Sequence, residues 1–111
     1  MYGLSEQCRK ELTDILSSIP AIEEAVIYGS RARGDYKPTS DIDITLKGKD
    51  LTFRDLALLD DKLYYSYLPY YCDTSIMRDL TNNDLIHNIE QNGKVFYKRN
   101  KGECKQTVSR E

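Results

Sequence analysis

The chain has 111 residues and a formal net charge of −2, and this length fits a single domain. A chain of this size buries roughly two-thirds of its unfolded surface, enough for one modest core. The slightly acidic balance argues against a general nucleic-acid binder, which carries a basic surplus, so no direct contact with nucleic acid is expected. A template-copying polymerase is disfavoured for the same reason, and because the chain has no room for a second domain to grip a duplex.

The cysteines indicate a reducing environment. The sequence has an odd number of cysteines, and they are widely spaced: Cys8, Cys72 and Cys104. No pair has the spacing of zinc ligands or of a disulfide framework. Reduced thiols of this kind are typical of a cytoplasmic protein, which is the location we expect. The sequence shows no charged-then-apolar leader and no apolar run near ~18 residues, so neither secretion nor a membrane partner is predicted.

The first half of the chain predicts a helix, a strand, a polar connection and a second strand. Residues 5–18 carry apolar side chains at helical spacing, with Ser5 as the N-cap. Residues 23–29 form a short apolar strand that stops at Gly29, where a short helical turn follows. Residues 41–47 alternate polar and apolar side chains, which predicts a strand with one buried face.

The third helix and strand follow from a cap and a β-rich run. Thr52 and Asp55 resemble a capping box in front of an apolar stripe that includes Phe53 and Tyr67. Residues 70–77 are rich in strand-forming side chains and predict a strand.

A last helix and a closing extended segment complete the expected domain. One of the asparagines at 82 and 83 caps the helix, and Gly93 suits its C′ position. Val95 to Tyr97 read as a closing strand. Beyond it the chain turns polar and loses periodicity. We therefore expect a folded domain over residues 1–98 and a flexible polar tail over residues 99–111.

Three aspartates are candidate metal ligands and catalytic groups. Strand alternation puts Asp41 and Asp43 side by side on one face, where two unpaired carboxylates would repel each other. A divalent cation removes that repulsion, and hard oxygen ligands suit Mg²⁺ or Mn²⁺. Asp73 is the only acidic residue inside the third strand, and it is the candidate third carboxylate. Alternation there turns Cys72 toward the opposite face and the core.

The start of the same stretch predicts a phosphate site. Gly29 and Ser30 lie where a strand ends, so free N–H groups, a hydroxyl and a residue without Cβ come together. Arg31 and Arg33 add positive charge, although ordinary salt-bridged or solvated roles remain open for both. A loop that holds phosphate, facing a strand that holds metal, describes a site for a metal-nucleotide.

These residues carry a resemblance to a known superfamily. Gly29-Ser30, then ten residues, then Asp41-Ile42-Asp43 resembles the signature of the polymerase-beta-like nucleotidyltransferases. The fuller Gly-Ser-Arg-Ala-Arg-Gly of residues 29–34 is most similar to the minimal nucleotidyltransferases, and the likeness extends over about residues 5–98. It implies an α+β fold, with a small mixed sheet and helices packed on one side.

The resemblance also implies a mechanism. Two Mg²⁺ ions, with Mn²⁺ as an alternative, are held by Asp41 and Asp43, with Asp73 completing one site and acting as general base for the acceptor hydroxyl. Gly29 and Ser30 then hold the β- and γ-phosphates of a nucleoside triphosphate, for which ATP is expected. Displacement at the α-phosphorus would transfer a nucleoside monophosphate, and positioning and charge do most of this work.

The partner is likewise implied by the family. Minimal nucleotidyltransferases are typically encoded beside a helical HEPN protein, a ribonuclease toxin that they neutralise by attaching AMP to a tyrosine. The resemblance thus implies a protein adenylyltransferase that acts as an antitoxin. Two alternatives stay open: a small-molecule nucleotidyltransferase subunit acting on an aminoglycoside-like hydroxyl, and a non-catalytic module that inhibits its partner by contact. The oligomeric state is not predicted.

A cluster of tyrosines is the one oddity of the composition. Packing at the corner between the third helix and the third strand is the preferred interpretation, and a docking surface or base-stacking platform is the alternative. The cluster consists of Tyr64, Tyr65, Tyr67, Tyr70 and Tyr71.

Overall fold

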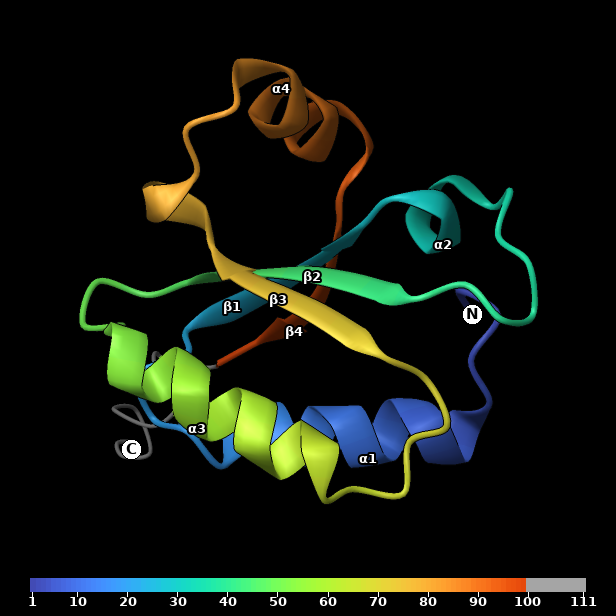
Figure 1. Ribbon diagram of the computed structural model, residues 1–111, viewed down its shortest axis with the longest axis horizontal. Helices are drawn as coiled ribbons and strands as arrows, with labels where there is room; N and C mark the ends of the chain where they lie inside the picture. The colour runs from blue at the N-terminus through green and yellow to red at the C-terminus, as the bar shows by residue number, and fades with distance from the viewer. Residues whose placement is uncertain (100–111) are drawn as a thin grey trace, which may run out of the picture.

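A four-stranded sheet forms the centre of the protein, with helices on both of its faces (Figure 1). The computed structural model describes residues 1–99, so the predicted tail lies outside the described residues except for Arg99. The α+β class and the mixed sheet are confirmed. The elements in chain order are α1 (Glu6–Ser17), β1 (Glu24–Tyr28), α2 (Ser30–Arg33), β2 (Ile42–Lys47), α3 (Phe53–Tyr64), β3 (Cys72–Ile76), the 3₁₀ turn η1 (Met77–Asp79), α4 (Asn83–Asn92) and β4 (Lys94–Lys98).

The strand order is β3-β2-β1-β4. The strand β1 pairs antiparallel with β2 and with β4, whereas β2 pairs parallel with β3. A parallel pair needs a crossover connection, and α3 supplies it between β2 and β3. The strands β3 and β4 are therefore the two edges of the sheet.

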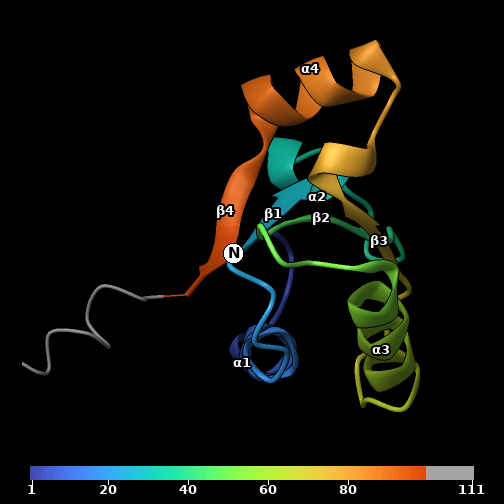
Figure 2. The same ribbon diagram turned by 90° about the vertical axis from the view of Figure 1, so that its left-hand side faces the viewer.

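The helices α1 and α3 lie side by side on one face of the sheet and build the main core (Figure 2). Each fully buried Leu or Ile side chain contributes about 1.5–3 kcal/mol by its removal from water. Leucine and isoleucine side chains with no exposed surface come from both helices and from β1 and β2, among them Leu12, Leu16, Leu59, Ile27, Ile42, Ile44 and Leu46.

The expected buried stripe of α3 was wrong at both ends. Phe53 is 79% exposed and Tyr67 is 93% exposed. Tyr67 lies three residues beyond the end of α3 at Tyr64, so helical spacing does not apply to it. Leu59, flanked by the half-buried Leu56 and Leu63, carries the core contact instead.

The opposite face of the sheet is covered by α4 over part of its area only. Ile89 of α4 packs against Val26 and Tyr28 of β1 in a second, smaller apolar cluster. The expectation that helices pack on one side therefore holds for α1 and α3, while α4 lies on the other. Where α4 does not reach, the polar residues of β2 and β3 face the open side, with Asp41 and Asp73 exposed.

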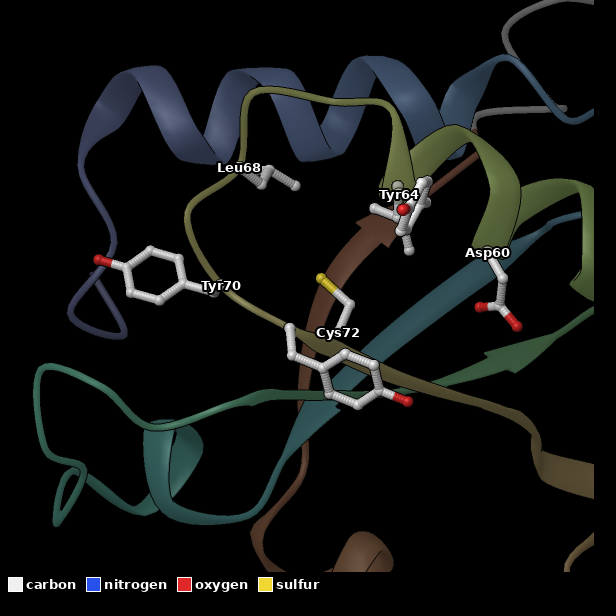
Figure 3. A pocket seen from close by; sticks show the side chains of 7 residues that line it. Asp60, Tyr64, Leu68, Tyr70 and Cys72 are labelled. Atoms are coloured by element: carbon white, nitrogen blue, oxygen red, sulfur yellow. The ribbon is translucent and has the colours of Figure 1, made fainter.

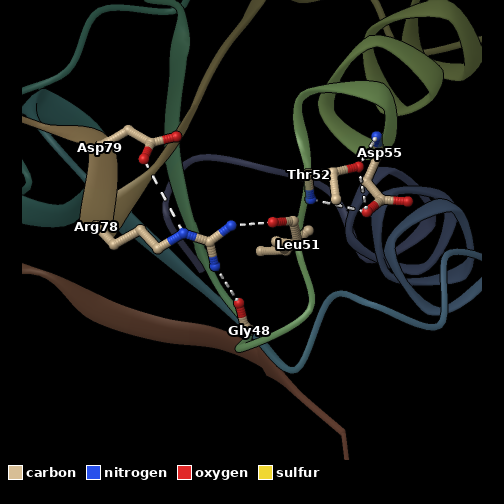
Figure 4. Close-up of polar contacts among 6 residues, drawn as sticks. All are labelled: Gly48, Leu51, Thr52, Asp55, Arg78 and Asp79. Carbon is tan, nitrogen blue, oxygen red and sulfur yellow. Dashed lines mark hydrogen bonds and ion pairs between the residues drawn. The ribbon is translucent and has the colours of Figure 1, made fainter.

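The predicted helix caps are confirmed. Ser5 Oγ accepts from the Cys8 N–H at 3.1 Å, and the side chain of Asn82 accepts from the Leu85 N–H at 3.0 Å. Thr52 and Asp55 form a complete capping box at the start of α3 (Figure 4). Such caps satisfy N–H groups that have no partner inside the helix.

Arg78 of η1 connects two segments that are distant in sequence. Its guanidinium donates to the carbonyl oxygens of Gly48, at 2.7 Å, and Leu51 (Figure 4). The turn after β3 is thereby fixed to the loop between β2 and α3.

Gly93 ends α4 in a way that the sequence did not predict. Its backbone conformation is extended, with a φ of −67°, rather than left-handed. A Cβ at this position would lie 2.4 Å from the Ile89 carbonyl oxygen and 2.8 Å from Val26 Cγ1. The glycine is thus needed because α4 approaches β1 closely where the chain enters β4.

The last described residue is held firmly to the first part of the chain. The Arg99 guanidinium donates to the carbonyl oxygens of Ser17, Ile19 and Ile22, at 3.0 to 3.1 Å. The contacts of the domain thus extend one residue beyond the boundary expected at 98. No helix within residues 1–99 is long and apolar enough to cross a membrane.

Candidate active site

The three predicted carboxylates lie on the face that α4 leaves partly open. Asp43 of β2 is the direct register partner of Asp73 of β3, and Asp41 precedes β2 by one residue. The hydroxyl of Ser75 donates to Thr45 Oγ1 at 2.9 Å, which shows that the next pair along the two strands shares this face. The parallel pairing therefore brings together acidic residues that are thirty positions apart.

The electrostatics of this face reflect an excess of negative charge. Burial raises the pKa of Asp43, the carboxylates of Asp73 and Asp41 raise it further, and Arg33 lowers it. Burial also raises the pKa of Tyr28, with added contributions from Asp43 and Asp73. A bound cation would relieve this repulsion, because it favours the ionised form of each carboxylate.

Gly29 fits the turn closely against the central carboxylate. It has a φ of +75°, in the region that favours glycine, and a Cβ there would lie 2.3 Å from Asp43 Oδ2. Ser30 follows as the first residue of α2, which confirms the short helical turn predicted at this position. The Gly-Ser turn and the second aspartate of the motif are thus in direct proximity.

Arg31 has a different role from the predicted phosphate contact. Its side chain is buried, with 2% of the residue exposed, and its guanidinium donates to main-chain carbonyls. Nε and Nη2 donate to the Ser40 carbonyl at 3.1 and 2.8 Å, and Nη1 donates to the Tyr2 carbonyl at 3.0 Å. A further bond of 3.4 Å reaches the Pro38 carbonyl.

Two tyrosine rings flank the same guanidinium. Its central carbon lies 5.3 Å from the ring centre of Tyr36 and 4.5 Å from that of Tyr70, within the range of cation–π attraction. Arg31 therefore fixes the loop that leads directly into Asp41. Of the clustered tyrosines, Tyr70 alone matches the packing interpretation, since the other four are 69–93% exposed.

Arg33 is the second predicted arginine, and it lies near the carboxylates. It forms an ion pair of 3.4 Å with Asp35, and both side chains are largely exposed. Its positive charge reaches Asp43, whose pKa it lowers. This position is compatible with a contact to substrate phosphate.

The same carboxylates are the candidate metal ligands. Among residues 1–99, no three His, Cys, Asp or Glu side chains converge closely enough to hold a metal by themselves. Asp41, Asp43 and Asp73 share a face without forming such a closed set. The donors are nevertheless hard oxygens, and Mg²⁺ usually binds through one or two carboxylates, waters and substrate phosphates. The residues therefore fit an ion whose remaining ligands come from a nucleotide.

The Gly-Ser turn thus lies against Asp43, whose strand pairs in parallel with that of Asp73. The sequence matches the family described as "Polymerase beta, Nucleotidyltransferase" over residues 10–102. The chain belongs to this family. No curated protein matches it by sequence.

Solved structures share the fold. A toxin–antitoxin complex with AMP-PNP superposes with a TM-score of 0.67 at 23% identity, covering 86% of this chain and 77% of that one. An MNT antitoxin complex with the tri-AMPylated HEPN toxin of Shewanella oneidensis gives 0.63 at 21% identity, covering 93% and 77%. A nucleotidyltransferase of Sulfolobus solfataricus, described there as putative, gives 0.52 at 27% identity, covering 82% and 77%. The first two similarities, below 25% identity, establish the fold alone.

Proposed function

We propose that the protein transfers AMP from ATP, in a Mg²⁺-dependent reaction, to a tyrosine hydroxyl of a HEPN-type toxin and thereby acts as its antitoxin in the cytoplasm. The observation that carries the chemical part is the direct pairing of Asp43 with Asp73, with Gly29 packed against Asp43. The partner is supported by two of the similar structures, a toxin–antitoxin complex with AMP-PNP and a complex of an MNT antitoxin with a tri-AMPylated HEPN toxin.

In this mechanism Asp41 and Asp43 hold Mg²⁺, with Asp73 completing the set. The bound ion would lower the pKa of the attacking hydroxyl and neutralise the departing pyrophosphate. Asp73 is exposed at the edge of the sheet, where it can accept the proton of the acceptor hydroxyl. The acceptor oxygen then forms a bond to the α-phosphorus, and the bond to the bridging oxygen of pyrophosphate breaks.

The phosphates of ATP are positioned by the turn. Gly29 and Ser30 offer main-chain N–H groups and a hydroxyl beside Asp43, and we assign them the β- and γ-phosphates. Arg33 adds a positive charge on the same side. Arg31 is left out of this assignment because its guanidinium is occupied by carbonyl oxygens.

Intact-mass measurement of the partner tests the proposal. The purified chain is incubated with the helical protein encoded beside it, ATP and Mg²⁺, and we expect the partner to gain the mass of one or more AMP units. The variant with Asp41→Asn and Asp43→Asn should add none, while circular dichroism checks that it is folded. An unmodified partner in the presence of the wild-type chain would refute the assignment.

The two alternatives give different outcomes in related assays. The first assay follows the label of α-labelled ATP. If the label appears on an aminoglycoside-like molecule and not on protein, the chain is a small-molecule nucleotidyltransferase. If a variant lacking all three carboxylates still neutralised the partner in cells, inhibition by contact alone would be the function.

A further inference from the structure

A cavity of about 380 Å³ opens at the edge of the sheet, between α3, the segment that follows it and the start of β3 (Figure 3). Tyr71 and Cys72 line it and directly precede Asp73 in the chain. The Tyr71 carbonyl accepts from the Ile42 N–H at 2.9 Å, which joins this segment to the start of β2. Neither the proposed transfer nor the binding of phosphate uses this cavity.

The lining combines apolar, aromatic and acidic groups. Cys72 Sγ points into the space from the β3 side, with Leu68 and Tyr64 across from it (Figure 3). Tyr64 and Tyr71 are 79% and 69% exposed, so both side chains are accessible to a ligand from solvent. Asp60 is the only charged side chain of the lining, within the part of the chain that the structure describes.

One carboxylate oxygen of Asp60 can accept a hydrogen bond from a ligand. Its Oδ1 accepts from the hydroxyl of Thr74 at 2.5 Å, and no hydrogen bond to Oδ2 occurs among residues 1–99. A lining that combines a carboxylate with tyrosine rings favours a cationic ligand, because the ring faces and the carboxylate both attract positive charge. The leucine and cysteine side chains suit the aliphatic stem that such a guest carries.

We infer that this cavity binds an arginine side chain of the acceptor protein and so holds that protein at the β3 edge of the sheet, the strand that carries Asp73 on its other face. Arginine fits better than lysine because its planar guanidinium stacks on aromatic rings while donating to a carboxylate. The protein already contains this combination: the guanidinium of Arg31 lies 4.5 Å from the ring centre of Tyr70. This inference rests on the proposed function where it says that the arginine belongs to the acceptor protein. The binding of an arginine side chain does not depend on that function.

The first experiment needs no catalysis. The ¹⁵N-labelled chain is titrated with N-acetyl-arginine amide and, separately, with N-acetyl-citrulline amide, which has the same shape without the charge. We expect the arginine compound to shift the amide signals of Asp60, Tyr71 and Cys72 and to bind about tenfold more tightly than the citrulline compound, as loss of one charge-assisted hydrogen bond would produce.

A matched pair of variants tests the carboxylate. Asp60→Asn should weaken the arginine compound about tenfold, whereas Asp61→Asn, at an exposed neighbour outside the lining, should leave its affinity unchanged. Equal binding of both compounds, or equal effects of both variants, overturns the inference. ATP alone shifting the same signals would also overturn it, because the cavity would then be a base-binding site.

The second experiment places the cavity in acceptor binding. In the transfer assay, Asp60→Asn should raise the KM for the acceptor protein about tenfold while kcat and the KM for ATP stay unchanged. If the cavity binds the arginine compound but Asp60→Asn leaves the KM for the acceptor protein unchanged, the docking role is refuted. If no acceptor is modified at all, the proposed function fails, and the titration still decides whether the cavity binds arginine.

Discussion

The two faces of the sheet differ in polarity and burial, and β2 shows the difference within one strand. Its apolar side chains Ile42, Ile44 and Leu46 are fully buried under α1 and α3. Its polar side chains face the other way, where the buried Thr45 contacts the half-buried Ser75 and Asp43 is partly exposed opposite Asp73. One face thus supplies stability, and the other supplies a charged site next to a small polar contact. Changes on the two faces should therefore have separable effects.

The largest expected effect is on the apolar face. Ile44→Ala should lower the free energy of unfolding by about 2–5 kcal/mol, since it leaves a cavity in the centre of the core. Thr45→Val, at the adjacent position on the opposite face, removes one hydroxyl partner of Ser75 and should cost about 1 kcal/mol. Urea denaturation measures both, and equal losses would contradict the division between the faces.

The two arginines of the motif should differ in their contribution to stability. Arg31→Met leaves several buried carbonyl oxygens without donors and should cost about 2–3 kcal/mol. Arg33→Met removes an exposed, solvent-screened ion pair and should change stability by less than about 0.5 kcal/mol. Thermal denaturation distinguishes them, and a larger stability loss in the Arg33 variant would show that the loop is held differently.

A smaller effect, of opposite sign, is expected at the charged face. Because the pKa of Asp43 is raised in the folded protein, the stabilising effect of its proton is lost as pH rises through that pKa. At neutral pH the ionised carboxylate is therefore unfavourable, and Asp43→Asn should raise the melting temperature by a few degrees in the absence of metal. Mg²⁺ with a non-hydrolysable ATP analogue should stabilise the wild type but not this variant. A lower melting temperature for the variant at neutral pH would contradict the sign.

The last prediction involves reactivity rather than stability. Burial, followed by the charges of Asp60 and Asp41, raises the pKa of Cys72 to about 12. Its thiolate fraction at mildly alkaline pH is roughly a thousandfold below that of an ordinary cysteine. Iodoacetamide should therefore modify the half-buried Cys8 well before Cys72 in the native protein, as peptide mapping would show. Similar rates at the two positions would mean that the β3 edge opens readily.

Much of this architecture could be predicted from the sequence because it is local. Strand alternation at 41–47, the caps at Ser5 and Thr52, and the spacing between Gly29 and Asp43 each depend on neighbouring residues. The choice of Asp73 as the third carboxylate drew on the family resemblance, and no local pattern predicted the parallel pairing that places it opposite Asp43.

The features that sequence reasoning missed depend on distant partners. Arg31 carries the charge expected of a phosphate ligand, but its partners come from the N-terminus, the loop before β2 and the segment before β3. The tyrosine cluster was expected to pack, yet most of its rings are exposed because α3 ends at Tyr64 and the segment after it runs along the surface. Tyrosine content alone does not distinguish these outcomes.

The position of β3 at the sheet edge has one more consequence. This strand is bonded to β2 on one side only, yet it carries Asp73, the carboxylate that we propose completes the catalytic set. Fraying of a single strand would separate Asp73 from its partners while the leucine and isoleucine core stayed intact. A preparation can thus give a normal denaturation curve and still be inactive, so hydrogen exchange at β3 is a better indicator of competence than global stability.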